Sequence, residues 1–139
     1  MPVTIGYACE DEVREVARRF EAREYALDEF THARHITVAV LYLAELDFEA
    51  AMTKMRAGLI AFSSHHGKMG YNETITRFWL LGVKDFISPL QQETLVARAN
   101  AAVMHFADKN LIFRHFTRDR LFSPEAAARW IEPDMLRMG

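Results

Sequence analysis

The sequence predicts an all-α protein: a single-domain, up-and-down bundle of about five main helices with a short helical appendage at the C-terminus. Apolar residues recur at helical spacing along most of the 139 residues. No segment alternates apolar and polar residues with the turn chemistry of a β-sheet. The few glycines and prolines fall between the helical segments, so residues 1–139 are expected to form one domain.

Composition excludes several classes of protein. A formal net charge of -2 argues against a nucleic-acid partner, and the single cysteine excludes a disulfide framework or a cysteine-based zinc cluster. The N-terminus does not resemble a signal peptide, and the longest apolar run, residues 36–44, is about half of a membrane span. We therefore expect a cytoplasmic protein without a membrane partner. A small-molecule partner and a homodimer remain open.

The first two helices are predicted over residues 10–28 and 32–46. In the first, Val13, Val16, Phe20 and Leu27 form one apolar stripe, with charged residues on the opposite face. Thr31 is suited to cap the second helix, which is apolar almost all round. A helix of that kind is usually central in a bundle.

The next two helices have clear start and stop signals. Asp47 is suited to cap the third helix, and Gly67 to end it as the first residue beyond its C-terminus. Asn72 is suited to cap the fourth helix, where Glu73 lies favourably in the first turn. Pro89 disfavours helix in the preceding residue, so this helix should end near Ser88.

The C-terminal third contains shorter elements. A fifth helix is predicted over residues 91–108 and a shorter piece over residues 110–116. Ser123 followed by Pro124 is a typical helix start, which predicts a last short helix to Ile131.

Topology predicts that polar residues gather at one end of the bundle. Short connections usually join antiparallel neighbouring helices. The N-terminal ends of the second and fourth helices and the C-terminal ends of the first, third and fifth helices are therefore expected at the same end of the bundle. Five of the six histidines fall at these termini: His32, His35, His65, His66 and His105.

Helical phase then selects the residues that face inward. At about 100° per residue, His32 and His35 continue the inner stripe of their helix, and His66 continues that of the third helix. Thr76 heads the inner stripe of the fourth helix, with Glu73 close in phase. A second set completes the candidate site: Glu29, Tyr42, Asn72 and Thr74.

Four interpretations of this cluster remain open. In the first interpretation, it is a polar cap whose side chains form hydrogen bonds with backbone groups at the helix ends. In the second, it is a pocket, bordered by two helix N-termini, for a small anionic or polar ligand. Alternatively, it binds a single transition metal ion, zinc or iron, or a His/Glu pair performs acid–base catalysis. A ferritin-like di-iron site is excluded because the second Glu-x-x-His is missing. The candidate metal ligands are His32, His35, His66 and Glu73.

Two segments carry a resemblance to a known family. FTHARH at residues 30–35 and YNETIT at residues 71–76 resemble a family of small all-helical bacterial proteins of unassigned function. Its pattern pairs Phe-Thr-His-x-x-His with a later Tyr-His-x-Thr-(Ile/Leu)-Thr, and the match covers about residues 29–87, with weaker agreement around Trp130 and Pro133. Asn72 stands where the family pattern has histidine, which weakens the metal and catalytic interpretations and leaves capping intact.

The leading hypothesis is a small-ligand-binding protein with a histidine-rich polar pocket at one end of the bundle, with enzymatic activity left open. The alternatives are a metal-binding protein that uses the same cluster, and a non-catalytic interaction protein with structural histidines.

Overall fold

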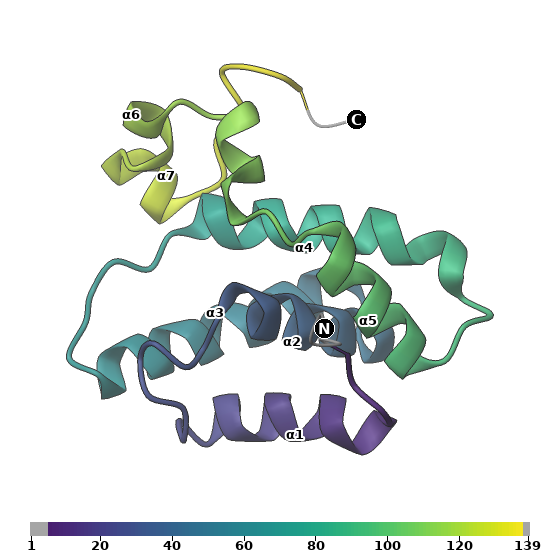
Figure 1. The fold of residues 1–139 in the computed structure, drawn as a ribbon. Coiled ribbons are helices and arrows are strands. Elements are labelled where there is room, and N and C mark those ends of the chain that lie inside the picture. Colours follow the sequence, from purple (N-terminus) through teal and green to yellow (C-terminus); the bar gives the residue numbers. More distant parts are fainter. Residues whose placement is uncertain (1–5, 138–139) are drawn as a thin grey trace, which may run out of the picture.

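A computed structural model describes residues 6–137 as a bundle of helices without a β-strand, which confirms the predicted all-α fold (Figure 1). Within that range, none of the helices is both long and apolar enough to cross a membrane. The elements in chain order are α1 (Glu10–Glu21), α2 (His32–Glu45), α3 (Phe48–His65), α4 (Glu73–Ile87), the 3-10 helix η1 (Ser88–Leu90), α5 (Leu95–His105), the 3-10 helix η2 (Lys109–Arg114), α6 (Arg118–Leu121) and α7 (Pro124–Ala128).

Helix α2 lies at the centre, as its sequence predicts. It contacts α1, α3, α4 and α5, and every residue from Ile36 to Tyr42 is buried. Figure 1 shows α1 on one side of α2 and α4 on the other. An apolar surface on all sides needs neighbours on all sides, which explains this placement.

The end of α1 differs from the prediction. The helix stops at Glu21 rather than continuing to residue 28, because Arg23 adopts a left-handed conformation with φ of 57°. The chain then buries Tyr25, whose ring packs 4.3 Å below the guanidinium carbon of Arg19. Leu27, predicted in the inner stripe, is instead exposed.

The end of α3 confirms the role of Gly67. Its φ is 68°, a conformation that glycine adopts without strain. The Gly67 N–H donates to the Ser64 carbonyl at 3.0 Å, and the Lys68 N–H donates to the Ser63 carbonyl at 2.8 Å. These two bonds form a Schellman motif, which satisfies carbonyls that the helix leaves open.

The predicted helix starts are confirmed at four caps. The side chain of each cap accepts a backbone N–H three residues further on: Thr31, Asp47, Asn72 and Ser123. Helix α5 is shorter than predicted because Thr94 caps it, so it starts at Leu95 and ends at His105.

The appendage, residues 109–137, packs on the start of α4, as Figure 1 shows for α6 and α7. Asn72 Nδ2 donates to the Leu121 carbonyl at 2.8 Å, and the Thr74 hydroxyl donates to the Arg129 carbonyl at 2.8 Å. The last short helix ends at Ala128, before the predicted Ile131. Helix α6, a four-residue helix capped by Thr117, was not predicted from the sequence.

Candidate functional site

His32 joins the start of α2 to the end of α5. Its Nε2 atom lies 2.8 Å from the carbonyl oxygen of Phe106, the residue that ends α5. Its ring stands edge-on to Trp79, with the ring centroids 4.6 Å apart. Burial lowers the pKa of His32, so the neutral ring, with a proton on Nε2, donates to this carbonyl.

His35 lies one turn further along α2 and has no comparable partner. Its Nε2 atom is buried and forms no hydrogen bond within residues 6–137. Its ring lies 6.1 Å from that of Phe30. Burial, with a smaller contribution from the nearby His32, lowers the pKa of His35 to about 4, so the ring is neutral near pH 7.

His66 is separated from these two histidines by aromatic rings. Its Nε2 atom lies 3.0 Å from the Tyr25 carbonyl, and its ring packs on Phe62 at 4.7 Å. Phe62 in turn packs on Phe30 at 5.4 Å. Phe30 and Phe62 therefore stand between His35 and His66 in a series of ring contacts, and the predicted histidine cluster does not share one open pocket.

The start of α4 forms a second cluster with α3. Glu73 accepts two bonds from Arg56, at 2.9 and 2.7 Å, and a third from the Tyr71 hydroxyl at 2.7 Å. The bonds from Arg56 lower the pKa of Glu73, and burial raises that of Tyr71 to about 12. Thr76 is buried and donates to the Asn72 carbonyl at 3.0 Å.

These contacts place Glu73 away from His66, the residue that ends α3. Arg56 precedes the end of α3 by nine residues, which is about 14 Å along a helix. Helix α4 therefore starts beside the middle of α3 rather than beside its end. Figure 1 shows the connection leaving the end of α3 and crossing to the start of α4.

The predicted metal ligands are not brought together. Within residues 6–137, no three His, Cys, Asp or Glu side chains converge where they could hold a metal ion. The Nε2 atoms of His32 and His66 each form a hydrogen bond with a backbone carbonyl. The Glu73 carboxylate accepts hydrogen bonds from Arg56 and Tyr71. His32, His35, His66 and Glu73 are therefore not arranged as one ligand set in this structure.

Two other predicted positions lie elsewhere. Tyr42 follows His32 by ten residues, about 15 Å along α2, and its hydroxyl donates to Glu21 at 2.5 Å. Lys54 Nζ lies 4.6 Å from the centroid of the Tyr42 ring, so this tyrosine joins α1, α2 and α3. His105 stacks on Phe86 of α4, with the ring centroids 4.3 Å apart.

A hollow of about 310 Å³ lies between the start of α2 and the end of α5. We call it the α2–α5 hollow. Its lining residues are Thr31, His32, Ala33, Val103, Met104 and Ala107. His32 was predicted as a site residue, but the α5 residues were not, because only the tertiary structure shows that α2 packs on α5.

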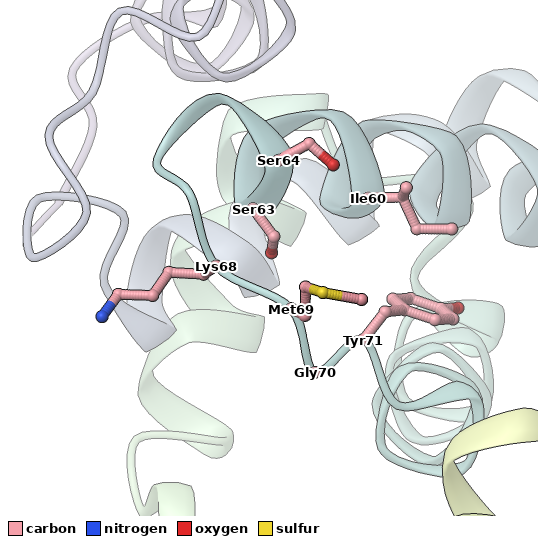
Figure 2. Close-up of a pocket in the computed structure, with 7 residues that line it drawn as sticks. All are labelled: Ile60, Ser63, Ser64, Lys68, Met69, Gly70 and Tyr71. Carbon is pink, nitrogen blue, oxygen red and sulfur yellow. The ribbon is translucent and has the colours of Figure 1, made fainter.

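A second hollow, of about 280 Å³, lies between the last turns of α3 and the connection to α4 (Figure 2). We call it the loop hollow. Figure 2 shows the Lys68 side chain extending away from it and the Met69 side chain directed at the Tyr71 ring. Its lining residues are Ile60, Ser63, Ser64, Lys68, Met69, Gly70 and Tyr71.

Known proteins add no further information about either hollow. Comparisons with protein-family models, with curated proteins and with solved structures each found no match. The candidate sites consequently rest on the geometry of this chain.

Proposed function

We propose that this protein binds a small molecule with a short apolar body and one carboxylate in the α2–α5 hollow. The observation that carries the proposal is a hollow of about 310 Å³ between the first turn of α2 and apolar side chains of α5. Small-molecule sites commonly combine apolar walls with a few polar groups that orient the ligand. Val103, Met104 and Ala107 supply the apolar wall.

The amides of His32 and Ala33, at the start of α2, have no hydrogen-bond partner among residues 6–137, which favours an anionic ligand group. The first N–H groups that are satisfied locally are those of Arg34, bonded to the Thr31 hydroxyl, and His35, bonded to the Thr31 carbonyl. The amides of His32 and Ala33 precede them. The first turn of this 14-residue helix contains no acidic residue, so no side chain of that turn offsets its positive end.

The test uses hexanoate and protein labelled with ¹³C in the methionine methyl groups. Met104 lines the hollow and is 76% exposed, so its methyl signal reports on binding there. We expect a saturable shift of the Met104 methyl with hexanoate and a much weaker response to hexan-1-ol, which lacks the carboxylate. Met104→Leu assigns the signal.

Two filling variants supply the matched controls. Ala107→Leu adds a side chain to the α2–α5 hollow at an exposed position and should weaken hexanoate binding about tenfold or more. Ser64→Leu fills the loop hollow instead and should leave the Met104 response unchanged. The proposal fails if Met104 shows no saturable shift, or if Ala107→Leu binds hexanoate as the parent protein does.

A second candidate function, binding of another protein, is favoured by the appendage. Phe122, Met135 and Leu136 are each more than half exposed, and Arg118 lies 4.2 Å above the Phe113 ring. Aromatic residues, methionine and arginine are enriched in protein interfaces. Light scattering over a range of protein concentrations tests the homodimer form of this function. A concentration-independent monomer would remove it.

A further inference from the structure

The loop hollow has one flat wall that is held rigidly. The Tyr71 ring forms this wall, and its hydroxyl donates to Glu73 at 2.7 Å. Glu73 is fixed in turn by two hydrogen bonds from Arg56. The Tyr71 ring is already oriented in the absence of a ligand. A ligand that stacks on it therefore binds with little loss of side-chain conformational entropy.

Two further apolar side chains at the hollow are exposed. Met69 is 98% exposed and Ile60 is 44% exposed. Figure 2 shows the Met69 side chain lying between the last turns of α3 and the Tyr71 ring. A flexible thioether next to an aromatic wall suits a flat ring, because sulfur and aromatic rings attract each other.

The charges around the hollow disfavour an anion. The hollow lies at the C-terminal end of α3, an 18-residue helix, where the helix dipole is negative. The Lys68 side chain points away in Figure 2, and the Arg56 charge is paired with Glu73. A hydroxyl group is present instead: Ser63 directs its oxygen into the space between α3 and the loop (Figure 2).

We propose that the loop hollow is a second binding site, which takes a small uncharged aromatic alcohol of the phenol class. The ring of such a ligand lies against Tyr71 and Met69, and its hydroxyl forms a hydrogen bond with Ser63. The site is independent of the α2–α5 hollow and differs from it in charge preference. The α2–α5 hollow borders the first turn of α2, whereas no helix start borders the loop hollow, which lies at the negative end of α3.

The test titrates phenol and benzoate into the same methionine-labelled protein. Met69 reports on the loop hollow and Met104 on the α2–α5 hollow, so the two proposals succeed or fail separately. We expect a saturable upfield shift of the Met69 methyl with phenol, and a response to benzoate at least about tenfold weaker. Met69→Leu assigns the signal.

Variants identify the groups responsible. Ser64→Leu fills the hollow and should abolish the Met69 response, and Ser63→Ala should weaken phenol binding several-fold. Ala107→Leu, at the other hollow, should leave phenol binding unchanged. The proposal is overturned if phenol gives no saturable shift, if benzoate binds as well as phenol, or if Ser64→Leu has no effect. A Met69 shift that depends on protein concentration without phenol would identify self-association instead.

Discussion

The Nε2 atom of His32 lies 2.8 Å from the carbonyl oxygen of Phe106, so the first residue of α2 caps the C-terminus of α5. These residues are 74 positions apart in the chain. The bond satisfies a carbonyl at a helix end, where no intrahelical partner exists. It also places the imidazole at the edge of the α2–α5 hollow. One side chain thus serves the packing of two helices and forms part of a candidate ligand site.

Removing the imidazole should destabilise the fold. We expect His32→Ala to lower the free energy of unfolding by about 1–3 kcal/mol, because the Phe106 carbonyl loses its donor and Trp79 loses a packed ring. His32→Gln keeps a donor and should lose less. Urea denaturation followed by circular dichroism measures both. A His32→Ala variant within about 0.5 kcal/mol of the parent protein would contradict this role.

Protonation of His35 should reduce stability in mild acid. The folded-state pKa is about 4, below the ordinary value of 6.5, so the unfolded chain binds the proton more tightly. Stability due to this residue is therefore complete above about pH 6.5 and is lost as the pH falls towards 4, by about 3 kcal/mol in total.

The pH prediction is measured as a difference between proteins. The free energy of unfolding of the parent protein should fall more steeply between pH 6.5 and pH 4 than that of His35→Leu, which has no proton to bind. His65→Gln, at an exposed position, is the matched control and should keep the steeper slope. Equal slopes in the parent protein and His35→Leu would show that His35 does not make this contribution.

Two glycines in helices should respond differently to alanine. A Cβ atom on Gly58 would lie 2.7 and 2.9 Å from atoms of the Phe20 ring, which is buried and stacks on Phe30. Gly58→Ala should therefore lower the free energy of unfolding by about 1–3 kcal/mol, although alanine is the better helix former. On Gly82 the closest atom, in the Phe106 ring, is 3.4 Å away.

Gly82→Ala is consequently the matched control. We expect it to leave the free energy of unfolding unchanged or to raise it by up to about 1 kcal/mol. Alanine has the higher helix propensity, and its Cβ atom would make no steric clash with Phe106. Thermal and urea unfolding of both variants measure the effects. The packing of Phe20 against α3 would be disproved if Gly58→Ala were as stable as Gly82→Ala.

Mutation should separate the two hydrogen bonds that the side-chain amide of Asn72 forms through its oxygen and its nitrogen. Its Oδ1 atom accepts the Ile75 N–H and caps α4, whereas Nδ2 donates to the Leu121 carbonyl of the appendage. Asn72→Asp keeps the cap and places a carboxylate against that carbonyl. Asn72→Ala removes both bonds and should cost about 1–3 kcal/mol of unfolding free energy.

Limited proteolysis measures the effect on the appendage. In Asn72→Asp, cleavage within residues 109–137 should become faster while α4 stays intact, because only the hydrogen bond from Asn72 Nδ2 to the Leu121 carbonyl is lost. Equal resistance in Asn72→Asp and the parent protein would show that this bond does not hold the appendage.

Local signals predicted much of the fold. The side chains of Thr31, Asp47, Asn72 and Ser123 each cap a helix by bonding an N–H three residues away, so their effect depends on the nearby sequence alone. The left-handed Gly67 is another local signal. The central position of α2 followed from its apolar surface alone.

The candidate site was predicted less well. Helical phase indicated that His32, His35 and His66 face inward, and each contacts buried or half-buried aromatic rings. Phase gives a direction around one helix axis, but it does not give the position along the neighbouring helix. Glu73 was grouped with the histidines on the assumption that α4 starts beside the end of α3, whereas its partner is Arg56.

The sequence by itself therefore determined the helical class, most helix starts and the inward faces, because these depend on residues within about one or two turns of each other. The tertiary structure alone decided that His32 caps α5, that Phe30 and Phe62 separate His35 from His66, and that two hollows flank the helix ends. These relationships depend on crossing angles and on how far one helix is shifted along another. Such quantities are set by the packing of all the side chains in the core at once.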